Sequence, residues 1–183
     1  MTKPTTELLE LLEFHRWATN LTVNAVQPLT PEQFTRDLGS GFPSVRDTLV
    51  HVFSADRAWL GRLEGQAPPR AIASDFADLA SLLEVWESVL QRWPSVVASV
   101  GDPGRLIEYK SFAGDPFTNT LGQIVRHVVN HGTYHRGQVA TMLRQLGAQA
   151  VSSDLISFYR ERGGPQASRF SDQDLRITTP KKI

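Results

Sequence analysis

The sequence predicts an all-α protein, a four-helix bundle with one long crossover connection. Apolar residues recur at i, i+3 and i+4 spacing in four long segments, as expected of helices that bury one face. Connections of modest length separate these segments, which favours helices packed side by side. With 183 residues, the chain is most simply one domain that can bury a sizeable core.

The first two helices have clear sequence boundaries. The first covers about residues 5–27, after which Pro28 and Pro31 break the apolar repeat and the letters PEQF suggest a short turn. The second covers about residues 44–65. It starts with Ser-x-x-Asp, in which the Ser44 hydroxyl can cap the helix N-terminus.

The third helix and the segment after it differ in character. Ser74 and Asp75 are expected to cap the third helix, which continues to about Trp93, where Pro94 would kink it or begin a new turn. The segment 106–118 contains β-favouring residues in RLIEYKSF and a turn at AGDP. We therefore expect a small β-hairpin or extended excursion before the fourth helix.

The fourth helix has both a start and a stop signal. A capping box of the Thr-x-x-Gln type begins at Thr120, and Gly147 follows the last apolar position. A short C-terminal helix is expected over residues 153–159. We interpret residues 1–162 as the bundle domain and 163–183 as a polar tail or surface strap.

Composition excludes several classes of protein. The net charge is +0, with 19 basic and 19 acidic residues, which argues against a nucleic-acid partner. The chain has 0 cysteines, so any metal would be held by nitrogen and oxygen ligands. The absence of cysteine fits a cytoplasmic protein. We find neither a signal peptide nor an apolar run of the ~20 residues that a membrane span needs.

Three histidines spaced four residues apart are the most informative feature of the chain. His131 lies seven residues after Ile124, and His135 lies seven after Val128, so both fall in the core-facing column, with His127 on its flank. Hydrogen bonding could satisfy two buried imidazoles. Left without partners, they would cost about 1–3 kcal/mol each. A shared metal ion would satisfy both.

His51 in the second helix is ambiguous by helical phase. It shares a face with small side chains, namely Ser44, Thr48, Ala55 and Ala58. Such a column either faces solvent or leaves room for a pocket against the fourth helix. Periodicity does not choose between these alternatives.

Common catalytic motifs are missing from the sequence. We find no Glu-x-x-His, the pattern of carboxylate-rich di-iron bundles, and no His-Glu-x-x-His, the zinc-protease helix. A Gly-x-Ser-x-Gly elbow, a P-loop and a dinucleotide fingerprint are also missing.

Four segments together resemble the DinB family of metal-binding bundles (DinB/YfiT-like). They are LLEFHRWATNLTVNAVQPLTPEQF, SVRDTLVHVFSADRAWLGRL, LGQIVRHVVNHGTYHRGQVATMLRQLG and SSDLISFYRERG. The resemblance spans almost the whole chain, and its most specific element is the run His-x-x-x-His-Arg-Gly-Gln. It implies a four-helix bundle that binds one divalent metal through three histidines, here His51, His131 and His135.

The resemblance also suggests neighbours for these ligands. His127 matches a frequent family histidine and is expected in the pocket wall or beside the ligands. Asn130, Tyr134 and Asp56 could hold similar places, although a surface or packing role suits each of them equally well. Arg136 points about 100° away from the ligand that precedes it, which favours a structural role.

Two glycines inside the fourth helix are unexpected. Gly132 and Gly137 each cost about 1 kcal/mol of helix stability relative to alanine. Their presence suggests close helix packing or space for a pocket. His15 in the first helix has no assigned role.

The resemblance implies a metal-dependent enzyme, either a thiol S-transferase or isomerase that uses a low-molecular-weight thiol, or a hydrolase. Three histidine ligands leave coordination positions open for water or substrate. Zinc and nickel are the expected metals, and manganese and iron also suit imidazole. The alternative is a non-enzymatic, stress-related protein that binds a metal or small ligand. Family resemblance further predicts a homodimer, with no nucleic-acid or membrane partner.

Overall fold

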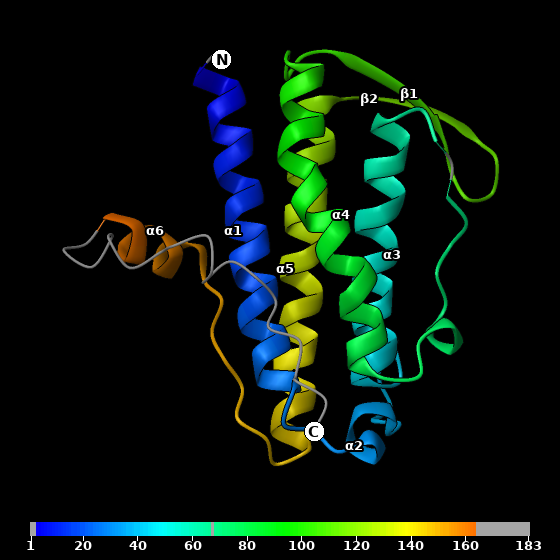
Figure 1. Ribbon diagram of the computed structural model, residues 1–183, viewed down its shortest axis with the longest axis vertical. Helices are drawn as coiled ribbons and strands as arrows, with labels where there is room; N and C mark the ends of the chain where they lie inside the picture. Colours follow the sequence, from blue (N-terminus) through cyan, green and yellow to red (C-terminus); the bar gives the residue numbers. More distant parts are fainter. Residues whose placement is uncertain (1–2, 67, 164–183) are drawn as a thin grey trace.

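Four long helices lie side by side and form the predicted bundle (Figure 1). The computed structural model describes residues 3–66 and 68–163. The helices are α1 (Lys3–Val26), α3 (Val45–Leu63), α4 (Leu79–Val100) and α5 (Leu121–Gln145). α5 packs against α1 and α3, and α4 packs against the same two helices. α1 and α5 run in one direction, and α3 and α4 run in the other.

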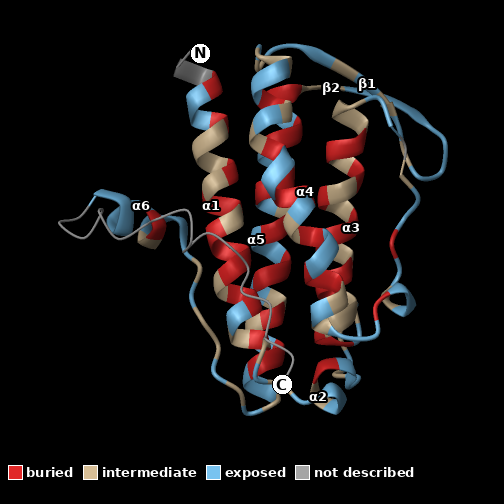
Figure 2. Cartoon of the chain, in the orientation of Figure 1, coloured by how far each residue is buried: buried red, intermediate tan, exposed pale blue. Residues whose placement is uncertain are grey.

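Each helix turns an apolar stripe toward the bundle axis (Figure 2). The largest fully buried side chains come from all four helices: Leu8, Leu49, Phe53, Leu60, Leu82, Leu83, Trp86, Trp93, Leu121, Ile124, Met142 and Leu143. Burying each such side chain contributes roughly 1.5–3 kcal/mol. The continuous core therefore holds α3 and α5 in fixed register.

α3 and α4 run in the same direction, which requires the long crossover that the sequence predicts (Figure 1). The crossover contains η1 (Ala73–Asp75), a short 3₁₀ turn. The prediction that Ser74 and Asp75 cap the third long helix is wrong. The Asp75 carboxylate accepts a hydrogen bond from the Ile72 amide at 2.9 Å and so closes the 3₁₀ turn. Asp78 caps α4 instead, and it accepts from the Ser81 amide at 2.8 Å.

Two prolines mark places where the structure adds to the sequence-based expectation. Pro94 lies inside α4, which continues beyond it to Val100. Pro31 begins α2 (Pro31–Thr35), a five-residue helix where a short turn is expected. Proline suits this first helical position because its missing amide hydrogen has no intrahelical role there.

The predicted hairpin is confirmed. β1 (Leu106–Lys110) pairs antiparallel with β2 (Pro116–Thr120), with Leu106 opposite Thr120. β2 leads directly into α5, and Thr120 forms the predicted capping box with Gln123. In Figure 1 the hairpin extends from the start of α5 toward the end of α3.

The predicted C-terminal helix is α6 (Leu155–Gly163), which extends beyond the expected end at residue 159. Its buried Phe158 packs against Phe14 and Trp17 of α1, with ring centroids 5.7 and 5.6 Å apart. The tail expected over residues 163–183 lies outside the described residues, apart from Gly163. None of the described helices is long and apolar enough to cross a membrane.

Candidate metal centre

Three imidazoles meet at the seam between α3 and α5. His51 comes from the first half of α3, and His131 and His135 come from consecutive turns of α5. One ring nitrogen from each residue lies within 4.8 Å of those of the other two. His51 Nε2 and His131 Nε2 are 2.9 Å apart. The structure therefore brings together the three histidines that the family resemblance implies as ligands.

The local sequence explains this convergence. Ile124 and Val128 are buried, so the column of α5 that also carries His131 and His135 faces the bundle. Packing of α5 against α3 then brings His51 opposite them. His135 is buried at 5% exposure, whereas His51 and His131 are half-buried, so the cluster is open on one side.

Two side chains set the orientation of the rings. His135 Nδ1 lies 2.7 Å from Gln138 Oε1, and because an amide oxygen can only accept, Nδ1 must carry the hydrogen. The lone pair of His135 is therefore on Nε2. Phe42 stacks on His51 at a centroid distance of 4.1 Å and covers one face of the cluster.

The three imidazoles are held in the neutral form that binds metals. Burial lowers the pKa of both His51 and His131 from 6.5 to about 4, and repulsion from His135 adds to this effect. Burial also lowers the pKa of His135, although the hydrogen bond to Gln138 opposes the shift. At neutral pH each ring can therefore present a lone pair.

A buried polar network lies behind the cluster. The Asp56 carboxylate is fully buried, and its Oδ2 accepts a hydrogen bond from Trp86 Nε1 at 2.8 Å. His15 Nε2 lies 3.1 Å from the same oxygen. Arg136, 4% exposed, donates from its guanidinium to His15 Nδ1 at 3.2 Å and to Thr133 Oγ1 at 2.9 Å.

The donor inventory determines the tautomer of His15. A guanidinium can only donate, so His15 Nδ1 accepts and Nε2 carries the hydrogen that Asp56 receives. In and beside this network, Asp56 Oδ1, His131 Nδ1 and Arg136 Nε are buried without a hydrogen-bond partner among the described residues. Burial lowers the pKa of His131, and the charge of the Asp56 carboxylate opposes part of that shift.

Gly132 makes room for this network. A Cβ at Gly132 would lie 2.4 Å from His15 Cε1 and 2.7 Å from a terminal nitrogen of Arg136. Gly137 has open space at the corresponding position. The expectation of close packing is therefore confirmed for Gly132, whereas nothing packs closely against Gly137.

The remaining predicted neighbours lie at different places. Asp56 belongs to the buried network. His127 is exposed, with its ring 5.7 Å from that of His131 and 5.3 Å from that of Trp59. Tyr134 is 65% exposed, and its ring contacts that of His135 at 5.0 Å. Asn130 does not join the cluster.

Asn130 is exposed and lines a separate groove with Leu11 and Leu155, toward α1 and α6. It directly precedes His131 along α5, so a helical rotation of about 100° separates the two side chains. A position next to a ligand in sequence is therefore a poor guide to contact with that ligand.

Sequence reasoning missed Phe42 and Gln138 and gave His15 no role, whereas the structural role expected of Arg136 is confirmed by its hydrogen bonds in the buried network. Gln138 was detectable, because it lies three residues after His135 on the same helix face. Phe42 lies in a loop, where no periodicity points to it. His15 and Arg136 are assigned only once α1 and α5 are seen to pack together.

The cluster is consistent with a divalent metal site. It offers three neutral imidazole nitrogens and no thiolate, a donor set suited to zinc, nickel, manganese or iron. Its open side leaves room for further ligands. His131 Nδ1 is buried without a hydrogen-bond partner among the described residues, whereas the second ring nitrogen of a metal-binding histidine ordinarily donates to a carboxylate, a carbonyl or water.

Fold and site together define a class of protein, a helical bundle with a three-histidine cluster between two of its long helices. Comparison with known families agrees with this class. The model of the DinB family matches residues 1–167, and the chain belongs to the DinB family.

Relatives agree with this assignment. The protein DinB of Bacillus subtilis (strain 168) is 25% identical over 153 residues, covering 79% of this chain and 89% of the relative. The uncharacterized protein YizA of the same organism is 24% identical over 132 residues, covering 70% of this chain and 80% of YizA. The crystal structure of a DinB-like protein from Bacillus cereus ATCC 10987 has a TM-score of 0.57 at 17% identity. The match covers 74% of this chain and 90% of that structure, and it agrees with the helical fold described above.

Proposed function

We propose that this protein is a metal-dependent enzyme that activates a small substrate at the three-histidine cluster, acting as a thiol S-transferase or as a hydrolase. The observation that carries the proposal is the convergence of His51, His131 and His135 with one side open. A closed structural site would ordinarily have four protein ligands, whereas a catalytic site keeps a position free.

A divalent ion bound by these imidazoles would lower the pKa of a thiol or of a water molecule beside it. Other side chains of the protein orient these imidazoles. Gln138 fixes the tautomer of His135, and Phe42 shields one face of His51. Asp56 is the proposed partner of His131 Nδ1 and would hold that ring in the metal-binding tautomer.

His127 is the proposed proton acceptor. Its ring lies at the edge of the cluster, next to His131. Partial desolvation by its neighbours, with a smaller effect from Arg62, lowers the pKa of His127 from its ordinary value. A neutral imidazole can take up the proton that the thiol or water loses.

The ligand assignment is tested by metal analysis of the purified protein and of three single variants, His51→Ala, His131→Ala and His135→Ala. Each variant should lose stoichiometric metal. The matched control is His127→Ala, which should retain the metal and lose turnover. Full metal retention in all three ligand variants would refute the assignment.

The reaction class is tested by screening the metal-loaded protein with low-molecular-weight thiols and electrophiles, and separately with ester and amide substrates. Thiol-dependent turnover supports the transferase, and turnover without thiol supports the hydrolase. Tight metal binding without turnover in either panel would identify a metal-binding module instead of an enzyme.

A further inference from the structure

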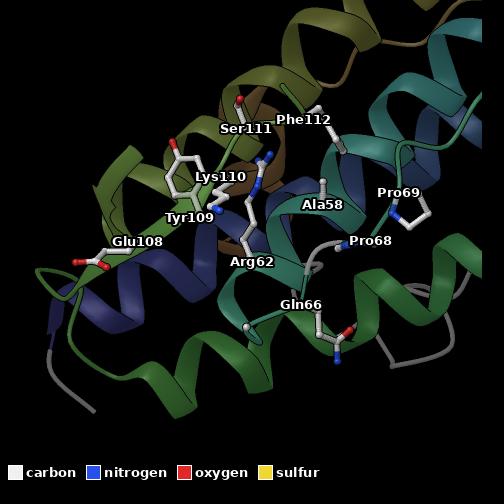
Figure 3. Close-up of a pocket in the computed structure, with 11 residues that line it drawn as sticks. Ala58, Arg62, Gln66, Pro68, Pro69, Glu108, Tyr109, Lys110, Ser111 and Phe112 are labelled. Carbon is white, nitrogen blue, oxygen red and sulfur yellow. The ribbon is translucent and has the colours of Figure 1, made fainter. Parts of the chain in front are cut away.

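A second cavity of about 400 Å³ lies beside the hairpin, between the C-terminal half of α3 and the start of the crossover (Figure 3). Ala58 and Arg62 line it from α3, and Glu108, Lys110 and Phe112 line it from the hairpin side. Figure 3 shows the Arg62 side chain extending from α3 toward the hairpin residues. A cavity of this volume can accommodate part of a small organic molecule.

Arg62 is held in this cavity by aromatic rings. Its guanidinium carbon lies 4.4 Å from the ring centre of Trp59, 5.0 Å from that of Tyr109 and 5.3 Å from that of Phe112. Burial lowers the pKa of Arg62. The guanidinium nevertheless remains charged at neutral pH, because the ordinary pKa of arginine is far above neutral.

The charge of Arg62 is unmatched. Its guanidinium forms no hydrogen bond and no ion pair with any residue that the structure describes. Arg92 and Arg162, by contrast, both contact carboxylates. Glu108 lines the same cavity without reaching Arg62 within ion-pair distance. A half-buried guanidinium held by rings and lacking a counterion is preorganised to receive an anion.

A row of side chains in contact lies between the cavity and the histidine cluster. The His127 ring lies next to His131 on one side and next to Trp59 on the other, and Trp59 lies against Arg62. Along α3, the small residues Ala55 and Ala58 occupy the helix face between His51 and Arg62. His51 and Arg62 are eleven residues apart, which is roughly 16 Å along the helix.

We propose that Arg62 binds a carboxylate of an elongated substrate whose reactive end lies at the histidine cluster. Its role in substrate recognition rests on the proposed function. The cavity lining carries two cations and one carboxylate, a net charge of +1, which suits a singly charged carboxylate better than a doubly charged phosphate. The planar guanidinium can bind both oxygens of a carboxylate at once. The aromatic rings favour an adjoining apolar or unsaturated group.

The test measures binding of benzoate and of its neutral analogue benzamide to the full-length, metal-free protein. Isothermal titration calorimetry gives the affinity, and the ¹⁵Nε resonance of Arg62 reports contact with the guanidinium. We expect benzoate to shift this resonance and to bind at least ten-fold more tightly than benzamide. Arg62→Gln should abolish the difference, and Arg62→Lys should leave a reduced preference.

The matched control is Arg144→Gln, which removes an exposed arginine of α5 that donates only to a backbone carbonyl. This variant should behave as the wild type. If benzoate fails to bind the wild-type protein, or leaves the Arg62 resonance unmoved, the proposal is overturned. Inorganic phosphate that binds as tightly as benzoate would overturn the assignment to a carboxylate.

Because these titrations use metal-free protein, their outcome is independent of the metal analysis of the histidine variants. In the metal-loaded protein, a thiol that carries a carboxylate should show a lower KM than its amide. Arg62→Gln should remove that difference without loss of bound metal. Loss of metal in Arg62→Gln would instead show that Arg62 acts on the fold of the cluster.

Discussion

At the scale of single residues, the candidate site depends on buried polar side chains that form hydrogen bonds with one another. Asp56 and Arg136 are buried charges on two different helices, and neutral His15 bridges them through both of its ring nitrogens. Buried charges without partners cost several kcal/mol, so removing one member is more disruptive than its individual hydrogen bonds suggest. Two predictions concern these residues.

Gly132→Ala should destabilise the protein even though alanine is the better helix former. The added Cβ would overlap the His15 ring and Arg136, at a cost of about 1–3 kcal/mol that exceeds the helix gain of about 1 kcal/mol. Gly137→Ala is the matched control on the same helix, where free space allows alanine to stabilise. Urea denaturation of both variants measures the difference, and equal stabilisation by both alanines would contradict this account.

Asp56→Asn should weaken metal binding and should also destabilise the fold, because it removes the buried carboxylate that offsets the charge of Arg136. The asparagine oxygen can still accept from Trp86, but it lacks the charge that favours the metal-binding tautomer of His131. We expect a loss of metal affinity of about ten-fold or more. Competition titration with a chromophoric chelator measures this affinity. An unchanged affinity would exclude Asp56 as the partner of His131.

At the scale of elements, α5 has a well-defined start that links the hairpin to the histidine-bearing turns. Thr120 is both the last residue of β2 and the N-cap of α5, so one residue determines where the strand ends and the helix begins. The cap satisfies amides that the first turn leaves without helical partners.

Thr120→Ala should lower the free energy of unfolding by about 1 kcal/mol, the usual effect of losing such a cap. Thr141→Ala, at an exposed position later in α5, removes a hydroxyl that donates to the Gly137 carbonyl and should have no such cost. Chemical denaturation of the two variants provides the comparison. An equal loss of unfolding free energy in both variants would mean that the Thr120 cap does not stabilise α5 more than an ordinary surface hydroxyl does.

At the scale of the whole molecule, the buried imidazoles couple stability to pH. Burial lowers the pKa of His51 and His131 from 6.5 to about 4 in the folded protein. The unfolded chain therefore takes up protons between pH 6.5 and 4 that the folded chain does not. The contribution of neutral His51 and His131 to the free energy of unfolding is therefore complete above pH 6.5 and declines as the pH falls toward 4.

Thermal melting of the metal-free protein should show Tm falling as the pH is lowered from 6.5 to 4. The double variant His51→Gln with His131→Gln should show a shallower decline, because both titrating groups are removed. In the metal-loaded protein, the ion should also be released in the acidic part of this range, where protons compete for the same nitrogens. A Tm that is equally pH-dependent in the double variant would assign the effect to other groups.

Much of this protein was predictable from local patterns in its sequence. The four apolar stripes, the Thr120 cap and the β-favouring segment 106–118 each specify an element through interactions between residues close in the chain. The column that places His131 and His135 on the core face of α5 is equally local. These features depend on backbone periodicity and capping, which a single sequence displays directly.

Tertiary structure decided the rest, because contacts between distant residues leave no periodic signature. Helical phase alone does not decide whether His51 faces solvent or a neighbouring helix. The packing of α3 against α5 decides this, and it places His51 beside His131 and His135. Asp75 resembles a helix cap in sequence, but its carboxylate closes a 3₁₀ turn in the crossover. The network of His15, Asp56 and Arg136 joins three helices, and it exists only where Gly132 lets them approach.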